Sequence, residues 1–437
     1  MTPGPWIRSR LERLVYVIAG LPIAIRGASL APSPAAREIR SAFARRYWRP
    51  ASVGEAGALV IGILLAPIAV PLGALWFTVR DGTAIREREG KGLAAQLAGQ
   101  LRLYGRAGVV GPWYYILSLY RDGPRRAPTF LQRCETKHGI YELLSDGPCE
   151  MLADKQLFSE CCAAAGLPCA GSEVAVGGNL PDCDLFVKPR RGRGGRGAER
   201  WDRIAAGRWS DGSRELGRNE LIAHLRSKSI PHIVQRRIRV HPALEALTSG
   251  AVPTVRALTI LDEQGEPEVV GTVFRMSVGA NRTVDNIHAG GLACSVTIDS
   301  GVLGKASNLG ADAKLGWVSH HPTTGARIEG TRLSCWDEVK QLAVRAHRAF
   351  KPRLLVGWDI AISESGPVLI EGNRGPDMDL MQRFMDVGFC ADGHRFGELL
   401  AYHLRVRRRT QLPRASLARG ANGATGKTAE AIAPLDG

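Results

Sequence analysis

The stretch from Val356 to Asp379, VGWDIAISESGPVLIEGNRGPDMD, constrains the fold most, because it predicts a β-hairpin with polar groups on its strands. An apolar run interrupted by Asp359 leads to a turn, and a second apolar run ends on Glu371 and Asn373. Alternate residues of a strand share a face, so the last two side chains lie together. If Asp359 faces the same way, three oxygen-bearing groups converge in a manner that suits Mg²⁺. An edge hairpin with ordinary solvated acids is the alternative.

The chain of 437 residues has a formal net charge of +16, and its arginines crowd the N-terminal third, the segment 190–200 and the segment 405–419. This length supports two or three domains with their own cores. The basic balance favours an anionic partner, which could be nucleic acid, acidic lipid or a phosphorylated substrate. Nine scattered cysteines form no CxxC pair and no zinc spacing, a pattern typical of reduced cytosolic thiols.

The segment 56–79, AGALVIGILLAPIAVPLGALWFTV, is a candidate membrane segment because it contains no charged residue. It is long enough to cross about 30 Å of hydrocarbon, with Trp76 near one interface. Pro67 and Pro71 would kink a span without excluding it. Basic residues flank both ends, so the positive-inside rule gives no orientation. The sequence leaves open whether the segment spans, forms a hairpin with an earlier segment, dips into the membrane or packs as a soluble helix.

The earlier apolar segment, Leu14 to Ile25, follows three arginines and resembles the hydrophobic region of a signal peptide. Arg26 interrupts the region where cleavage would occur, and a cleaved signal would export the rest of the chain. We therefore expect this segment to stay in the mature protein.

A glycine-rich loop lies in the part of the chain that begins near Ser145 and reads as a soluble α/β enzyme. A predicted strand over 184–189 carries Lys188 and runs into RRGRGGRG, whose glycines are Gly192, Gly194, Gly195 and Gly197. Glycine amides and arginines can cover phosphates, with the lysine as a point charge beneath them. The P-loop pattern and the strand-to-helix context of a Rossmann fingerprint are both missing. An RGG-type RNA segment is the alternative, although such segments occur in long disordered tracts.

The remaining sequence alternates helices and strands around these two features. A helix is expected to begin at Leu152–Lys155, with Asp154 in its first turn, and to end near Gly166. The further expected elements are a helix over 218–226, a strand over 233–235, a hairpin over 253–261 and 267–275, a donor-rich loop over 285–291 and a helix over 335–350.

Five motifs in this order resemble those of the ATP-grasp superfamily. They are Asp154-Lys155 on a helix, FVKP before the glycine loop, Val234-Gln235 at a hinge, Arg275 before VDNIHAGG, and GWDIAI followed by LIEGNRGPDMDL. The closer resemblance is to the sugar-transfer-associated ATP-grasp family, itself similar to α-L-glutamate ligases, and it spans roughly Gly108 to Arg405. It implies an α+β ATP-grasp fold, in which two subdomains clasp ATP. A helical, hydrophobic N-terminal region precedes this fold and lies outside the resemblance.

The resemblance also implies a reaction and the residues that serve it. ATP-grasp enzymes phosphorylate a carboxylate, and an amine or another nucleophile captures the acyl phosphate, which releases ADP and phosphate. The implied cofactors are ATP and Mg²⁺, with two metal ions expected. The implied roles are phosphate binding for Lys155 and Lys188, a lid for Gly192, Gly194, Gly195 and Gly197, a hinge for Val234 and Gln235, metal binding for Asp359, Glu371 and Asn373, γ-phosphate or acyl-phosphate binding for Arg275 and Arg256, and positions in the same pocket for Asn286 and His288.

The hinge departs from the pattern of many relatives, which carry an acidic residue just after the position of Gln235 for the adenine amino group or the ribose. This chain has Arg236 and Arg237 there. The backbone around Val234 to Arg236 could still read adenine, so phosphate binding is better supported than nucleotide specificity.

We expect three regions along the chain. They are an N-terminal helical region over 1–107 with the candidate membrane segment 56–79, an ATP-grasp domain over 108–409, and a disordered tail over 410–437. The ATP-grasp domain is expected to comprise a helical lead-in over 108–150, an ATP-binding lid subdomain over 151–240 and a metal-binding subdomain over 241–409.

The resulting functional hypothesis is an ATP-dependent carboxylate ligase on the cytoplasmic face of the inner membrane, serving cell-surface polysaccharide biosynthesis. Its partners would be a small-molecule carboxylate and a nucleophile, one of them sugar-linked, and the membrane surface. The alternative function is that of a membrane-associated ATP-binding protein with a regulatory role. The alternative location is the soluble cytoplasm. An RNA-binding role is opposed by basic tracts that lack interleaved aromatics, so no nucleic-acid partner is expected.

Overall fold

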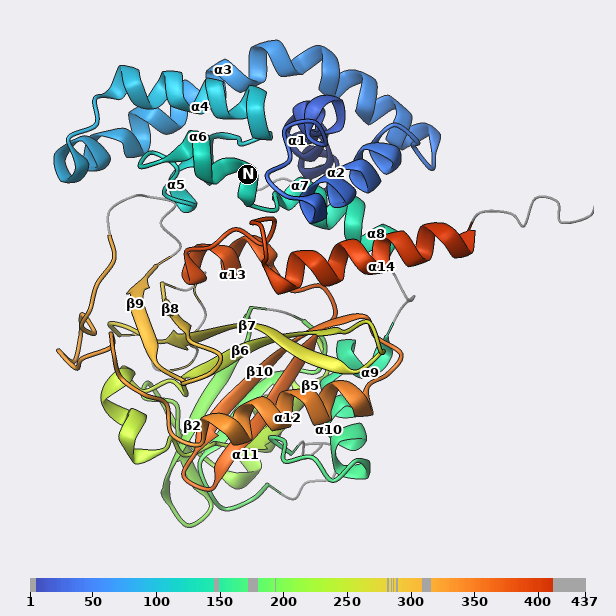
Figure 1. Cartoon of the computed structure of the whole chain (residues 1–437). Coiled ribbons are helices and arrows are strands. Elements are labelled where there is room, and N and C mark those ends of the chain that lie inside the picture. The colour runs from blue at the N-terminus through green and yellow to red at the C-terminus, as the bar shows by residue number, and fades with distance from the viewer. Residues whose placement is uncertain are drawn as a thin grey trace, which may run out of the picture.

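The structure is a computed structural model that describes residues 5–144, 149–171, 180–192, 194–280, 283, 285, 287, 290–308 and 316–411. A layer of N-terminal helices lies on one side, and two β-sheets with their covering helices lie on the other (Figure 1). The C-terminal helices α13 (Met378–Met385) and α14 (Arg395–Gln411) lie between them.

The N-terminal layer is helical throughout. Its members are α1 (Pro5–Arg26), α2 (Pro34–Tyr47), α3 (Val53–Glu89), α4 (Leu93–Ala107), α5 (Gly111–Ile116), α6 (Gly123–Arg126), η1 (Ala127–Thr129), α7 (Arg133–Glu135), η2 (Thr136–Ile140) and α8 (Tyr141–Leu143). Ser52 caps α3 by accepting a hydrogen bond from the Glu55 amide, and Gly90 ends it in the left-handed conformation. Among the described residues, α3 is the one helix with the length and apolarity to cross a membrane, and most of its apolar window is exposed.

The smaller sheet lies in the expected lid subdomain. Its strands pair in the order β4-β3-β2-β1-β5, and they are β1 (Leu185–Pro189), β2 (Glu199–Ala205), β3 (Arg208–Ser210), β4 (Glu215–Gly217) and β5 (His232–Arg236). α11 (Arg218–Arg226) packs on this sheet. α9 (Glu150–Ala153) and α10 (Lys155–Ala164) fall within the expected lid range, but Phe158 and Cys162 of α10 are buried in the core of the larger sheet. Trp201 and Trp209 are fully buried with Leu221 of α11, so this subdomain has a hydrophobic core of its own.

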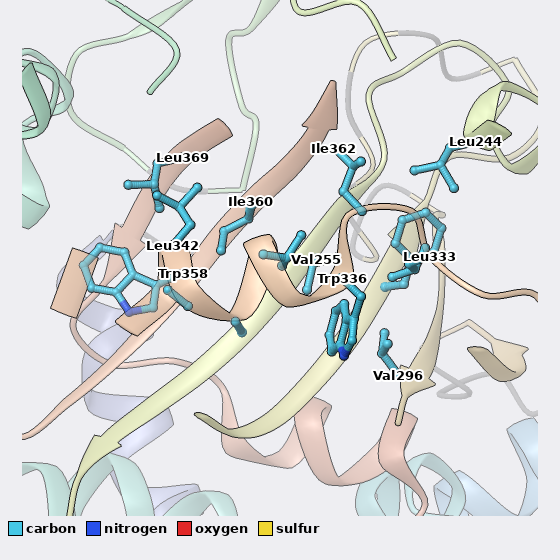
Figure 2. Close-up of a cluster of buried hydrophobic side chains, with 14 of the residues drawn as sticks. Leu244, Val255, Val296, Leu333, Trp336, Leu342, Trp358, Ile360, Ile362 and Leu369 are labelled. Carbon is cyan, nitrogen blue, oxygen red and sulfur yellow. The ribbon is translucent and has the colours of Figure 1, made fainter. Parts of the chain in front are cut away.

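The larger sheet has six antiparallel strands in the order β11-β10-β6-β7-β8-β9. They are β6 (Thr254–Leu261), β7 (Pro267–Met276), β8 (Leu292–Val296), β9 (Leu303–Ser307), β10 (Leu355–Ser363) and β11 (Gly366–Asn373), with η4 (Pro242–Leu247) before them and α12 (Trp336–Ala349) between β9 and β10. Alternation along the strands gives the sheet two buried faces. Figure 2 shows the face under α12, where Val255, Trp358 and Ile360 meet Leu342. The opposite face packs against α13 and α14.

The α+β fold expected from the sequence is confirmed, including the hairpins β6–β7 and β10–β11. One boundary was wrong: the helix expected from Leu152 is divided, because Asp154 has an extended backbone (φ −109°, ψ 115°) and forms the N-cap of α10. α14 continues to Gln411, and the rest of the expected tail, 412–437, lies outside the described residues. Ala36 and Ile39 of α2 share a hydrophobic cluster with Leu400 of α14, and the domain boundary at 107 stays a prediction.

Candidate functional site

A cavity of about 1080 Å³ brings most of the predicted site residues together. Its walls come from β1 and β5 of the smaller sheet, from β6, β7, β10 and β11 of the larger sheet, and from α13. The predicted residues that line it are Lys155, Lys188, Gly192, Gly194, Gly195, Gln235, Arg256, Arg275, Asp359, Glu371 and Asn373. Gly197 and Val234 are described but do not line it, and Asn286 and His288 lie outside the described residues.

The three predicted metal ligands share one face of the β10–β11 hairpin. In the strand register Asp359 lies opposite Glu371, and Gly357 lies opposite Asn373. The Asn373 amide donates to Glu371, with an Nδ2 to Oε1 distance of 3.3 Å. Within the described part of the chain, no three histidine, cysteine or acidic side chains group as a metal site. Two carboxylates and one amide still fit a Mg²⁺ ion that takes further oxygens from ATP phosphates.

Two arginines hold Asp359 on the same sheet face. Arg256 Nη2 lies 2.9 Å from Asp359 Oδ2, and its Nε contacts Oδ1. Arg275 Nη2 lies 3.1 Å from the same Oδ2. Burial opposes ionisation of this carboxyl, yet the charges of Arg256 and Arg275 hold the pKa of Asp359 below its ordinary value. Asp359 is therefore ionised and doubly compensated.

Lys188 is the buried cation of the opposite wall. Its side chain points into the cavity from β1, and in the described part of the chain it has no hydrogen-bond or ion-pair partner. The pKa of Lys188 is lowered to about 8, chiefly by burial; the charge of Lys155 contributes to this lowering, and the charges of Glu371 and Asp359 oppose it. An ammonium in such a position is suited to an incoming anion.

Lys155 ties the start of α10 to the glycine loop. Its Nζ donates to the Gly192 carbonyl over 2.9 Å, and its backbone amide donates to the Arg190 carbonyl over 3.1 Å. Asp154 caps α10 through the Gln156 amide and also binds Arg190 Nε at 2.7 Å. The loop that follows β1 is thus anchored to the first turn of α10.

The glycines of the loop have backbones that other residues rarely adopt. Gly192, Gly194, Gly195 and Gly197 have φ values of 137°, 75°, 69° and 73°. This conformation explains the glycine-rich sequence, because a Cβ atom would strain the backbone at each position. The loop can therefore bring its amides close to a ligand.

The hinge residues have different surroundings. Val234 is buried in the core of the smaller sheet, so its side chain packs instead of reaching a ligand. Gln235 Nε2 donates to the Ala170 carbonyl over 2.5 Å, and both residues line the cavity. Arg236 and Arg237 also line it, and Arg237 forms ion pairs with two acids of the lid subdomain.

Sequence reasoning missed a polar residue and an apolar wall of the cavity. Asp285 accepts a hydrogen bond from Thr254 and lies 3.4 Å from Arg275 Nε. Burial raises the pKa of Asp285, and Arg275 opposes this shift. Its place in the motif VDNIHAGG was the signal that could have identified it. The apolar wall comprises Val273, Ile287, Leu380, Met381 and Phe384, and in the sequence such residues are indistinguishable from ordinary core.

The fold and the site together define an ATP-grasp protein. The sequence profile described as sugar-transfer associated ATP-grasp matches residues 145–390, which is more than half of the chain. The chain belongs to the sugar-transfer associated ATP-grasp family, as its motifs predicted.

Several solved structures are similar to the chain. The L-amino acid ligase from Bacillus licheniformis has 12% identity and a TM-score of 0.34, over 61% of this chain and 56% of that one. The D-alanine-D-alanine ligase from Coxiella burnetii has 9% identity and a TM-score of 0.34, over 60% of each chain. The biotin carboxylase domain of the Hydrogenobacter thermophilus 2-oxoglutarate carboxylase, in complex with MgADP, ADP and bicarbonate, has 13% identity and a TM-score of 0.33, over 59% of this chain.

This chain spans 46% of the length of that carboxylase chain. No curated protein sequence matches the chain. The roles proposed for individual site residues rest on the family motifs and on the geometry of this chain.

Proposed function

We propose that this protein is an ATP-dependent carboxylate ligase that forms an acyl phosphate and passes the acyl group to an amine or another nucleophile. The observation that carries the proposal is that two lysines, a glycine loop, two arginines and three oxygen-bearing side chains line one cavity. Phosphoryl transfer depends mainly on positioning and charge neutralisation, and this set of groups supplies both.

ATP would lie between the two sheets. Its phosphates would neutralise Lys188, whose ammonium is buried at the cavity wall, and the amides of the loop from Gly192 to Gly197 would cover them. Lys155 anchors this loop and carries a second positive charge close to Lys188. The adenine would lie at the hinge near Gln235 and Arg236, where it could be read by the backbone.

Asp359, Glu371 and Asn373 would hold Mg²⁺, and two ions are proposed. When bound, Mg²⁺ would neutralise charge on the phosphate oxygens during transfer. Asp359 is engaged by Arg256 and Arg275, so ligand binding requires an exchange of partners. The two guanidinium groups would move to the transferred phosphoryl group or the acyl phosphate, whose oxygens match their planar fork.

The second substrate would occupy the cavity beyond the arginines. The volume of about 1080 Å³ slightly exceeds the range of about 300–1,000 Å³ that is usual for one ligand, so two small molecules could share it. Arg256 and Arg275 suit the carboxylate of the substrate, and Leu380 and Phe384 offer an apolar surface beside it. We propose a small-molecule carboxylate and a nucleophile, one of them sugar-linked, in cell-surface polysaccharide biosynthesis, because the family is associated with sugar transfer.

We place the protein at the cytoplasmic face of the inner membrane. The long apolar helix α3 supports a membrane location, and the reaction needs cytosolic ATP. The proposed domain organisation follows the sheets, with the lid subdomain over 151–240 and the metal-binding subdomain over 241–409.

The test is release of ADP by the purified full-length protein, with a panel of carboxylic acids supplied with and without amines, sugar amines or alcohols. We expect release to depend on Mg²⁺ and on one class of acid. A hydroxamate formed when hydroxylamine replaces the nucleophile would identify the acyl phosphate. If no acid in a broad panel stimulates ADP release while ATP still binds, the ligase proposal is wrong.

A further inference from the structure

One face of α3 is exposed along most of its length. Its large apolar side chains follow helical spacing, and they are Val53, Val60, Ile61, Leu64, Leu65, Ile68, Leu72, Leu75, Trp76 and Val79. Leu64 is 70% exposed, Leu72 is 61% exposed and Trp76 is 64% exposed. A continuous apolar face of this size is rare on a protein that meets only water. We call these ten residues the apolar face of α3.

The opposite side of α3 packs closely on the helical layer. Gly62 lies so near α1 that a Cβ atom there would stand 2.4 Å from Val17 Cγ1. Farther along, Gln100 of α4 donates to Thr78 Oγ1 over 2.7 Å and to the Ala74 carbonyl over 3.2 Å. This side is small and polar, so it is built for helix contacts and not for lipid.

Both ends of α3 are joined to the same body. At the start, Glu55 binds Arg46 at 3.1 Å, and Arg46 also binds Glu142 at 2.6 Å. At the end, Arg121 binds Glu89 at 2.8 Å.

The segments that hold the two ends also contact the metal-binding subdomain. Arg133 binds Asp379 at 3.1 Å, and Ser118 accepts a hydrogen bond from Arg383 over 2.8 Å. A bilayer crossed by α3 would separate its two ends by the full hydrocarbon thickness of about 30 Å. The bilayer would then have to pass through the part of the protein that joins the two ends of α3. The structure is therefore incompatible with α3 as a single span.

The position of α3 fits a membrane surface instead. Figure 1 shows it bending across the outer side of the helical layer, away from the sheets. Its 37 residues make about 55 Å of helix, and Pro67 and Pro71 interrupt the regular hydrogen bonding in the middle.

The charge pattern of the face favours a bilayer over a protein partner. Within the apolar stretch 56–79 the chain has no charged residue, whereas a protein interface is usually ringed by polar groups. Arg86 continues the face at its C-terminal end, seven residues after Val79, and is exposed. Arg80, four residues after Trp76, is also exposed, and its guanidinium binds the buried Asp81 at 2.6 Å. Arginines beside an apolar face match anionic phospholipid headgroups.

We propose that α3 is an in-plane membrane helix, whose apolar face enters one leaflet of an anionic bilayer while the helical layer and the catalytic cavity stay on one side. The inference rests on the membrane attachment in the proposed function and adds its geometry. The cavity then opens in the aqueous phase, separated from the lipid by the helical layer.

Vesicle binding tests the apolar face. The full-length protein would be sedimented with vesicles of equimolar phosphatidylcholine and phosphatidylglycerol. The triple variant Leu64→Ser, Ile68→Ser, Leu72→Ser should lower the partition coefficient at least about a hundredfold, because three exposed apolar side chains no longer enter lipid. The matched control Leu30→Ser, Ile204→Ser, Val406→Ser changes three exposed apolar residues elsewhere and should bind as the unaltered protein does. Ile68→Glu serves as a second variant, with circular dichroism as the check of folding.

Protease protection tests the topology. Tags at both termini should be protected from external protease in intact cells, as one-sided attachment requires. Cleavage of the N-terminal tag alone would show a span and overturn the proposal. Unchanged vesicle binding by the triple variant would also overturn it, and so would conversion of a dimer to a monomer by that variant without lipid, which would identify a protein interface.

The failure of this proposal can be told apart from failure of the ligase function. Glu371→Gln should bind vesicles as the unaltered protein does, because it lies in the cavity and not on the apolar face of α3. The triple variant should release ADP at the normal rate on a water-soluble substrate. Unaltered protein that binds vesicles but releases no ADP with any acid would therefore count against the enzyme proposal alone.

Discussion

The two walls of the cavity hold their charges in opposite ways. On the lid wall, Lys188 is buried without a partner in the described part of the chain, and Lys155 binds a backbone carbonyl. On the wall of the larger sheet, Asp359 is paired with Arg256 and Arg275. Lys188 thus carries a buried charge without an ion-pair partner in the described part of the chain, whereas Asp359 on the sheet wall is paired twice.

This difference assigns different tasks to the walls. A buried, uncompensated ammonium gains most from a polyphosphate, so the lid wall should determine nucleotide affinity. A compensated cluster must exchange partners before it can act, so the sheet wall should determine turnover and contribute to stability. Substitutions on the two walls should therefore have effects that differ in kind.

The largest effect is expected on the sheet wall at Glu371. Glu371→Gln removes one of the two carboxylates proposed to hold Mg²⁺, and the acid-dependent rate of ADP release should fall about a thousandfold. The fold should persist, because Glu371 is only partly buried. The matched control is Glu364→Gln in the exposed turn of the same hairpin, which should keep full activity. A rate within tenfold of normal for Glu371→Gln would remove this residue from the metal site.

Arg256 should have the next largest effect, on stability. Arg256→Ala leaves the buried carboxylate of Asp359 with one arginine, and the free energy of unfolding should fall by about 3 kcal/mol. Urea unfolding of the nucleotide-free protein measures this loss. The double variant Arg256→Ala, Asp359→Asn should regain most of it, because no unpaired charge remains. Equal stability of the single variant and the unaltered protein would show that the pair is not compensated as described.

Substitution of Lys188 should raise the stability of the protein, in contrast to substitution of Arg256. Lys188→Met removes a buried charge, so the protein should become more stable while its affinity for ATP falls about a hundredfold. Lys188→Arg should restore the affinity only in part, since a planar fork differs in shape from a point charge. Isothermal titration with ATP and urea unfolding of the same variants give the two readings. Normal ATP affinity in Lys188→Met would show that the lid wall does not bind phosphate.

The sequence predicted those parts of the site that depend on local pattern. The placement of Asp359 and Glu371 on one face follows from alternation within one hairpin, and the loop after β1 follows from the glycine run from Gly192 to Gly197. The compensation of Asp359 by Arg256 and Arg275 depends on the register of β10 against the β6–β7 hairpin, and Arg256 and Asp359 are 103 residues apart in sequence. No local pattern encodes such a register.

Other features were hidden because their residues have ordinary core patterns. Leu380 and Phe384 lie on a short amphipathic helix, and only the placement of α13 beside the cavity gives them a possible contact with substrate. The apolar character of α3 was evident, but the contacts that exclude a single span depend on the tertiary structure, in which Arg46 binds both Glu55 and the distant Glu142, and Arg121 binds Glu89. The residue types within each motif were thus predictable, whereas the contacts between distant elements required the tertiary structure.

The smallest expected effect is a pH dependence that the lid wall alone should show. Burial lowers the pKa of Lys188 to about 8 in the nucleotide-free protein, and bound phosphates would raise it again. Between these two pKa values ATP binding takes up one proton, so the dissociation constant should rise about tenfold per pH unit above pH 8 and stay nearly constant below it. Lys188→Arg should remove this dependence, because a guanidinium stays protonated throughout the range. A rise of equal slope in that variant would trace the effect to another group, whereas its loss would show that an ammonium on the lid wall binds the nucleotide only in its charged form.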